Sequence, residues 1–187
     1  MAGARPFRYM PRKPREEVAG GIFHVYARGN DKRLIYRDDF DRNAYLRLLA
    51  GTVRKCRWRL LAFCLMENHV HLLIETPEAN LGVGMQRLHS DYAQQFNLRH
   101  GRSGHVFQGR YGAVRAERDD QLWGAAAYIA MNPVEAGLCK DPEEWPWGSH
   151  RAIVRGGGPR WLDVDRLLGY FAGAGGDPRE RYCEMFR

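Results

Sequence analysis

The stretch WRLLAFCLMENHVHLLIE, residues 58–75, contains two apolar runs separated by a short polar turn. Apolar runs of this length on either side of a turn predict two strands joined as a hairpin. The second strand carries His69 and His71, where a buried strand ordinarily carries aliphatic residues. Alternate side chains of a strand share a face, so both imidazoles are expected to point the same way and Val70 the other way.

The segments on either side of this hairpin predict two further strands and two helices. Residues 22–28, IFHVYAR, alternate apolar and polar side chains as a strand does. Residues 38–56 place apolar side chains along one helical stripe after two aspartates that can cap a helix, and residues 80–100 repeat this spacing after Asn80. A fourth strand is predicted within residues 107–117. This order indicates an α+β fold of the ferredoxin-like, split-βαβ type, an antiparallel sheet with helices on one face.

The chain after the fourth strand is predicted to be helical. A helix is expected to begin at Asp119 or the next residue, run through an alanine-rich stretch, and stop near Asn132 because Pro133 follows. One short amphipathic helix is expected over residues 164–171 and a second from Asp177.

The length of 187 residues suits one main domain with a small appendage. The predicted organisation is a basic N-terminal arm over residues 1–20, a main domain over residues 21–150, and a linker with a short helical C-terminal extension over residues 151–187. A glycine-rich break at residues 155–160 supports the last boundary.

The formal charge of +7 is concentrated in two segments. Residues 1–15 contain five basic side chains and no acid, and residues 99–118 contain arginines and histidines against the single acid Glu117. Basic side chains interleaved with Phe107 and Tyr111 are typical of a surface that binds nucleic acid. The alternative is a basic face that only contacts solvent.

Several classes of protein are excluded by composition. The longest apolar runs are too short to cross a bilayer, and the basic start of the chain is not followed by the apolar core of a secretory signal. The four cysteines form no C-x-x-C pair, which argues against a zinc knuckle and a disulfide framework. A cytoplasmic protein without a membrane partner, associated with the nucleoid when it binds DNA, is expected.

The histidine pair on one strand face could bind a divalent metal. Neutral imidazole is a good ligand, but two nitrogens are too few, so a third group must come from elsewhere in the fold. The alternative is a pair of hydrogen-bonded histidines on a half-exposed face.

Tyr128 and Asn132 lie four residues apart on a predicted helix and therefore share a face. A tyrosine oxygen can act as a nucleophile and an amide oxygen can complete a metal site; a core tyrosine and a helix-end asparagine are the alternatives.

Four separated motifs give the chain a resemblance to a known family. ENHVHLLIE, residues 67–75, resembles the His-hydrophobic-His motif of the HUH single-tyrosine transposases, the insertion-sequence-200-like group. HGRSGHVFQGRY (100–111), YIAMNPVEAGL (128–138) and PEEWPWGSH (142–150) resemble in particular its REP-associated tyrosine transposase branch. The resemblance runs in register from about residue 21 to residue 150, and it implies a ferredoxin-like fold and cleavage of single-stranded DNA.

The resemblance implies roles for four residues. By position, His69 and His71 are metal ligands, Asn132 is the third ligand where insertion-sequence relatives more often carry glutamine, and Tyr128 is the nucleophile. The implied reaction is a transesterification assisted by Mg²⁺ or Mn²⁺, in which Tyr128 displaces a 3′-oxygen and becomes joined to the 5′-phosphate. Because one chain has one such tyrosine, joining two DNA ends needs either a homodimer or successive use of one site.

Five further residues lie in motif strings of the family or in the basic segment: Arg28, Asn30, Arg110, Tyr111 and Arg115. Contact with single-stranded or hairpin DNA is one interpretation of them, and ordinary turn or sheet-edge structure is the other. Tyr111 also competes with Tyr128 as the nucleophile. Tyr128 is preferred, because Tyr111 falls on a predicted strand at a position where the resembling family accepts phenylalanine.

Two other functions compete with the transposase. One is a metal-dependent phosphodiesterase in which water attacks, which a trapped covalent adduct would distinguish. The other is a non-enzymatic nucleic-acid-binding module with a ferredoxin-like fold and stacking aromatics on its sheet. The second is disfavoured because the sheet carries histidines where stacking aromatics would be expected.

Overall fold

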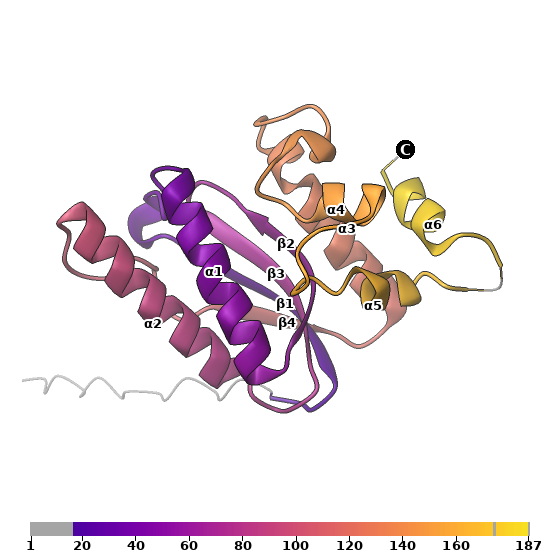
Figure 1. Cartoon of the computed structure of the whole chain (residues 1–187), viewed down its shortest axis with the longest axis horizontal. Helices are drawn as coiled ribbons and strands as arrows, with labels where there is room; N and C mark the ends of the chain where they lie inside the picture. Colours follow the sequence, from indigo (N-terminus) through magenta and orange to yellow (C-terminus); the bar gives the residue numbers. More distant parts are fainter. Residues whose placement is uncertain (1–16, 174, 187) are drawn as a thin grey trace, which may run out of the picture.

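Four antiparallel strands form one sheet at the centre of the computed structural model, which describes residues 17–173 and 175–186 (Figure 1). The strands are β1 (Gly21–Arg28), β2 (Arg59–Leu65), β3 (His69–Thr76) and β4 (Gly112–Ala116). Their order is β2-β3-β1-β4, so the predicted β2–β3 hairpin forms one half of the sheet and β1 lies between β3 and β4. This arrangement confirms the predicted ferredoxin-like, split-βαβ fold.

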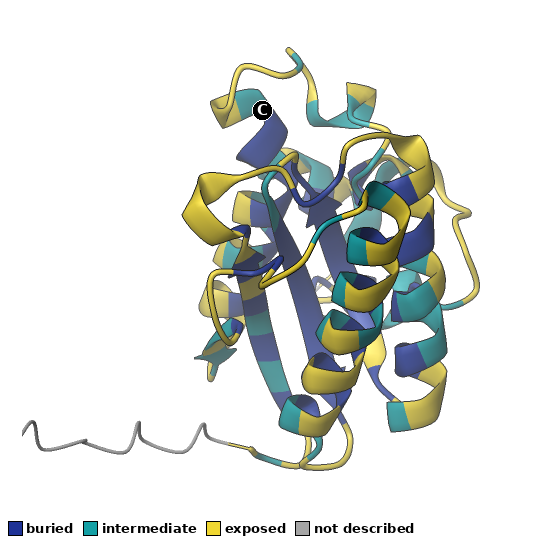
Figure 2. Ribbon diagram, turned by 90° about the vertical axis from the view of Figure 1, so that its left-hand side faces the viewer, coloured by how far each residue is buried: buried dark blue, intermediate teal, exposed yellow. Residues whose placement is uncertain are grey.

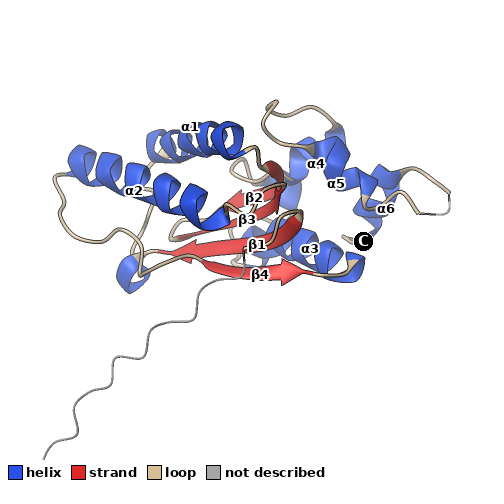
Figure 3. Cartoon of the chain, turned by 90° about the horizontal axis from the view of Figure 1, so that it is seen from below, coloured by secondary structure: helices blue, strands red, loops and turns tan. Residues whose placement is uncertain are grey.

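Two long helices, α1 (Asp39–Cys56) and α2 (Leu81–His100), pack side by side on one face of the sheet (Figure 3). As predicted, Asp38 caps α1, because its side chain accepts a hydrogen bond from the backbone N–H of Asp41. Asn80 precedes α2 but does not cap it. Its amide oxygen instead accepts a hydrogen bond from Trp58 Nε1, and its amide nitrogen donates to the carbonyl of Cys56.

The other face of the sheet is covered by α3 (Asp119–Glu135) and the C-terminal segments, so the protein has helices on both faces and not, as predicted, on one face alone (Figure 3). The smaller elements that follow are η2 (Pro142–Glu144), α4 (His150–Arg155), α5 (Val164–Gly169) and α6 (Pro178–Glu184), and a short η1 (Asn30–Lys32) follows β1. Two hydrophobic cores result, one on each face. The strands between them are largely buried, while the outer faces of the helices are exposed (Figure 2).

The third helix extends past the predicted stop at Asn132. Pro133 lies inside α3, and the helix continues to Glu135 because the N–H of Ala136 still donates to the carbonyl of Asn132. Pro133 removes only the hydrogen bond that its own N–H would have donated to the carbonyl of Ile129. Asn132 is therefore held in a regular helical turn.

The C-terminal extension packs on the sheet. Leu167, Phe171 and Tyr182 are buried in the second core together with Leu73 of β3. The predicted helices near residues 164 and 177 are present, and α4, which the sequence did not predict, begins at His150, on the expected domain boundary. Among the described residues no helix is both long and apolar enough to cross a membrane.

Candidate active site

His69 and His71 share the sheet face that α3 covers. The side chains between and beyond them, Val70 and Leu72, belong to the core under α1 and α2, whereas Leu73 belongs to the core under α3. The strand alternation predicted from the sequence is therefore present. His71 is 6% exposed, so its imidazole is largely removed from solvent.

The neighbouring strand β1 adds three side chains to the same face. Tyr26 pairs with His71 and Arg28 pairs with His69 in the antiparallel register, and His24 lies two residues before Tyr26. The His24 and His71 rings lie 5.1 Å apart between centroids, and the Tyr26 and His71 rings 6.3 Å apart.

Helix α3 positions Tyr128 and Asn132 above these histidines. Leu122, Ala126 and Ile129 form the buried stripe that packs α3 on the sheet. The Tyr128 ring meets the ring of His71 edge to face, with 5.3 Å between centroids, and remains 45% exposed. The four residues predicted to act together therefore lie on one side of the sheet.

The side-chain amide of Asn132 has a fixed orientation. Its nitrogen Nδ2 donates to the backbone carbonyl of Tyr128 at 2.9 Å, so the oxygen Oδ1 is the atom that faces His69. Oδ1 of Asn132 lies 3.3 Å from Nε2 of His69. The i, i+4 spacing of Tyr128 and Asn132 thus positions an amide oxygen beside an imidazole nitrogen.

The imidazole of His69 is oriented in a similar way. Asn68 Nδ2 donates to the carbonyl of Lys32, which leaves Oδ1 of Asn68 to accept from Nδ1 of His69 at 2.7 Å. In the neutral ring the proton then sits on Nδ1, and Nε2 has a lone pair. Burial lowers the pKa of His69 and favours this neutral ring. Nε2 of His69 and Oδ1 of Asn132 lie within hydrogen-bonding distance, and Oδ1 accepts a hydrogen bond from Nε2 only when that nitrogen is protonated. In the tautomer with the proton on Nδ1, both atoms can instead bind a cation.

His71 makes its own contact through Nδ1, which lies 2.9 Å from Nε2 of His24. When His71 is the donor in this pair, its Nε2 is unprotonated and available as a ligand. Burial, followed by the neighbouring imidazoles of His24 and His69, lowers the pKa of His71 to about 3. Both predicted ligand histidines are thus neutral near pH 7, with Nδ1 engaged by a neighbour.

The donor pair of His69 and Asn132 fits a divalent ion in spacing. Two ligands that each lie about 2.1 Å from one Mg²⁺ at right angles are about 3.0 Å apart, and the observed distance between Nε2 of His69 and Oδ1 of Asn132 is 3.3 Å. Within residues 17–173 and 175–186, no cluster of three or more His, Cys, Asp or Glu side chains is placed to hold a metal. The set of His69, His71 and Asn132 differs from such clusters because its third donor is an amide.

The remaining predicted contact residues do not all reach this site. Arg28 is exposed on the same sheet face as His69, and its charge contributes to lowering the pKa of that histidine. Asn30 and Arg110 are exposed in the segments that follow β1 and precede β4. Arg115 pairs with Phe23 and therefore points to the opposite face of the sheet.

Tyr111 is 5% exposed in the hydrophobic core between the sheet and the first two helices. A ring in that position has no open face for a nucleobase and lies across the sheet from the histidines. The structure therefore disagrees with the prediction that Tyr111 contacts DNA, and it leaves Tyr128 as the better placed of the two candidate nucleophiles.

Sequence reasoning missed His24, Tyr26 and Asn68. His24, Tyr26 and Arg28 alternate with apolar residues in the first predicted strand, so their common face could be read from the sequence. Their position beside His71 could not, because it depends on β1 pairing with β3.

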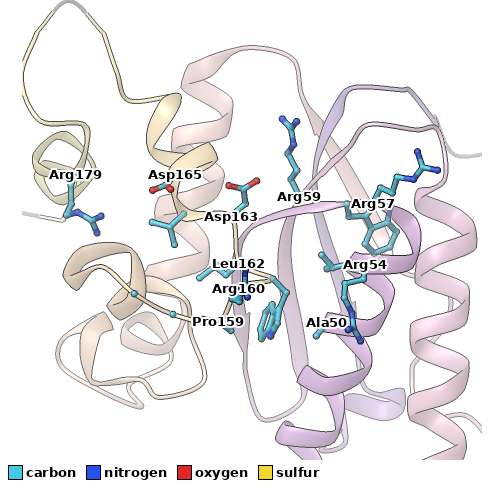
Figure 4. Close-up of a pocket in the computed structure, with 16 residues that line it drawn as sticks. Ala50, Arg54, Arg57, Arg59, Pro159, Arg160, Leu162, Asp163, Asp165 and Arg179 are labelled. Carbon is cyan, nitrogen blue, oxygen red and sulfur yellow. The ribbon is translucent and has the colours of Figure 1, made fainter.

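A groove lies away from these residues. A groove of about 1130 Å³ runs between the end of α1, the start of β2 and the segment 157–165 (Figure 4). Five arginines line it: Arg54, Arg57, Arg59, Arg160 and Arg179. The groove lies at the opposite end of β2 from the turn that leads to His69, so it is separate from the histidine site.

Comparison with known proteins identifies a family, a curated relative and a structure of similar fold. The chain is 24% identical over 151 residues to a Haemophilus influenzae protein that carries the name REP-associated tyrosine transposase; the match covers 74% of this chain and 85% of the relative. It also resembles a solved structure of a REP-associated tyrosine transposase bound to a REP hairpin, with a TM-score of 0.65 and 19% identity over 80% of this chain and 89% of that one. The family model of IS200-like transposases matches residues 17–132, which include both histidines, Tyr128 and Asn132. Since this match spans more than half of the chain, the chain belongs to the IS200-like transposase family.

Proposed function

We propose that this protein is a metal-dependent DNA transposase of the REP-associated type, which cleaves and rejoins single-stranded DNA through a phosphotyrosine at Tyr128. One observation above all supports this proposal. Nε2 of His69 and Oδ1 of Asn132 lie 3.3 Å apart, and the half-exposed ring of Tyr128 lies on the same side of the sheet. This geometry suits a cation beside a nucleophile.

In the proposed cleavage step, the Oη atom of Tyr128 attacks the phosphorus of one phosphodiester. A bond forms between Oη and phosphorus, and the bond from phosphorus to the 3′-oxygen breaks. The phenol proton passes to solvent, which reaches the 45% exposed ring, and the departing 3′-oxygen gains a proton to become a free hydroxyl. In the rejoining step, a 3′-hydroxyl attacks the phosphotyrosine and releases Tyr128, so no external energy source is needed.

Nε2 of His69, Nε2 of His71 and Oδ1 of Asn132 would hold Mg²⁺ or Mn²⁺. When bound, the ion would supply Lewis-acid stabilisation of the charge on the phosphate oxygens. Asn68 and His24 would keep the two imidazoles in the ligating tautomer. Because Asn132 and Tyr128 both lie on α3, the helix would keep both side chains at a fixed distance from the sheet.

The proposed DNA substrate is single-stranded next to a hairpin. The attacking ring lies close against the sheet, so the scissile phosphate must enter with its neighbouring bases unpaired. Arg28 is exposed beside His69 on the same face and can bind an adjacent phosphate. The structural relative is described as bound to a REP hairpin, and the formal charge of +7 on this chain favours an anionic partner. Joining two DNA ends would then use either two subunits or one site twice.

The proposal is tested with hairpin oligonucleotides that carry a single-stranded flank and a label at either end. Incubation of the protein with these and Mn²⁺, followed by a denaturing gel, should give a protein-linked product from the strand 3′ of the cut and a free 3′-hydroxyl that a polymerase extends. Cleavage without any covalent product would favour the phosphodiesterase in which water attacks. Binding without cleavage in either metal would favour the non-enzymatic module.

A further inference from the structure

Part of the sheet face that carries the histidines is not covered by α3. On this part, Tyr26 of β1 is 44% exposed and Val114 of β4 is 58% exposed. Both belong to the same face as His24, since Val114 pairs with His24 and Tyr26 lies two residues further along β1. An exposed aromatic ring and an exposed aliphatic side chain therefore lie together beside the catalytic histidines.

Gly112 explains how the Tyr26 ring lies in this region. A Cβ atom added to Gly112 would come within 2.3 to 2.7 Å of three atoms of the Tyr26 ring and hydroxyl. Real Cβ contacts are never this short, so the ring rests directly on the backbone of β4, in space that any other residue would fill. The absence of a side chain at Gly112 thus leaves room for the aromatic ring to lie against the sheet.

The Tyr26 ring lies near the histidines of the proposed reaction. Its centroid lies 6.3 Å from that of His71 and 5.8 Å from that of His24, and Arg28 follows two residues later on the same face. Residues two apart on a strand are about 7 Å apart, so a nucleotide could place its base at Tyr26 and an adjacent phosphate near Arg28. Tyr26 is not needed to orient either ligand histidine, because Asn68 and His24 make those contacts.

We infer that Tyr26, resting on Gly112 and flanked by Val114, is a stacking subsite for one unpaired nucleobase next to the scissile phosphate. The inference rests on the proposed function and makes it more specific. A nucleobase matches the surface chemically, because it offers a flat π-face to the ring and a C–H edge or methyl group to Val114, while its phosphate can meet Arg28. A base in duplex DNA has both faces stacked, so the subsite selects single-stranded DNA at this position.

The test is a coupling measurement between Tyr26 and each base that flanks the cut. Tyr26→Leu removes the π-face and Tyr26→Phe keeps it. Because Tyr26 is 44% exposed, thermal unfolding should be nearly unchanged in both variants. The substrates are the cleavable hairpin and copies in which one flanking base at a time is replaced by an abasic site. Initial rates of adduct formation give kcat and KM for each combination.

Tyr26→Leu should raise KM about 5- to 100-fold, the range expected from the loss of one stacked base, with a smaller change in kcat. One abasic position should raise KM for the unmodified protein and leave Tyr26→Leu unaffected, which identifies the stacked base. Tyr26→Phe should behave as the unmodified protein does. Gly112→Ala, whose Cβ would push the ring aside, should change KM in the same direction as Tyr26→Leu.

Three results would overturn the inference, and they are distinguishable. If the unmodified protein forms its adduct but Tyr26→Leu couples to no flanking base, the stacking subsite is wrong and the proposed function stands. If Tyr26→Phe abolishes the adduct while DNA binding persists, the Tyr26 hydroxyl takes part in the chemistry instead. If the unmodified protein neither binds nor cuts any of the hairpins, the proposed function fails and the subsite fails with it.

Discussion

Nε2 of His24 lies 2.9 Å from Nδ1 of His71, so a residue of the first strand directly contacts one of the two histidines of the HVH motif. Buried polar contacts of this kind orient metal-binding imidazoles in many proteins. Asn68 provides the equivalent contact to His69 at 2.7 Å. The proposed metal site is therefore built from two layers of side chains, and the outer layer can be altered without removing a ligand.

His24→Phe should weaken Mn²⁺ binding about 10- to 100-fold, because it keeps a ring at this position but removes the partner of His71 Nδ1. Isothermal titration of the DNA-free protein with Mn²⁺ measures this effect. His89→Gln, which alters a histidine on the opposite side of the sheet, is the matched control and should bind Mn²⁺ normally. Unchanged affinity in His24→Phe would show that the contact does not orient a ligand.

Changes at Asn132 should move metal affinity in opposite directions. Asn132→Asp replaces a neutral oxygen donor by a charged one and should bind Mn²⁺ more tightly, whereas Asn132→Leu should lose most of the affinity. Mn²⁺ should correspondingly raise the Tm of Asn132→Asp and of the unmodified protein but not that of Asn132→Leu. Equal metal affinity in all three proteins would exclude Asn132 as a ligand.

Protein stability should fall as the pH is lowered, partly because of His89. Burial lowers the pKa of His89 to about 4, so the unfolded chain, with a pKa near 6.5, binds the proton more readily than the folded protein does. The free energy of unfolding is therefore highest above pH 6.5 and falls as the pH drops from 6.5 towards 4, by up to about 1.4 kcal/mol per pH unit for this residue.

Urea unfolding at pH 7.5, 6 and 5 measures this dependence. His89→Gln keeps a polar group near the Tyr45 hydroxyl, which lies 3.4 Å from Nε2 of His89, but cannot titrate. The variant should show a shallower fall between pH 6.5 and 5 than the unmodified protein. Parallel curves for the two proteins would contradict the assignment.

The C-terminal extension should depend on the ion pair between Arg166 and Glu75. The carboxylate of Glu75 is 8% exposed and accepts from Arg166 Nε at 2.7 Å. Arg166→Met keeps the apolar stem but removes this ion pair, so that Arg59, 3.3 Å away, is the cation left beside the buried carboxylate. The change should lower the free energy of unfolding by about 1–3 kcal/mol. The double variant Glu75→Gln with Arg166→Met should lose less than the sum of the two single changes, and full additivity would argue against the pairing.

Much of the fold followed from periodicity in the sequence. The hairpin of residues 58–75 and the helices after Asp38 and Asp119 have strong apolar patterns, and the structure contains them within a few residues of the predicted ends. The shared face of His69 and His71 followed from strand geometry alone. Asn132 was expected at the helix end, but Pro133 lies too near the C-terminus of α3 to stop it.

Contacts between separate strands could not be predicted in the same way. His24 meets His71 only because β1 pairs with β3, and Tyr26 is open to solvent because α3 does not cover the part of the sheet that carries Tyr26 and Val114. The sheet does carry an exposed aromatic, Tyr26, beside the histidines. Tyr111 was assigned to DNA contact from its basic surroundings, but side-chain alternation in and before β4 directs it into the core.

In the proposed reaction, the hydroxyl of Tyr128 becomes covalently joined to DNA. The most direct measurement is mass spectrometry of tryptic peptides after incubation with a cleavable hairpin and Mn²⁺, with Tyr128→Phe as the comparison. Tyr128→Phe removes one oxygen from a half-exposed ring, so its fold and its DNA affinity should be retained while adduct and cleavage disappear. We expect DNA joined through its 5′-phosphate to the peptide that contains Tyr128, and no such adduct in the variant. A normal cleavage rate in Tyr128→Phe, or an adduct on any other tyrosine, would contradict the proposed reaction.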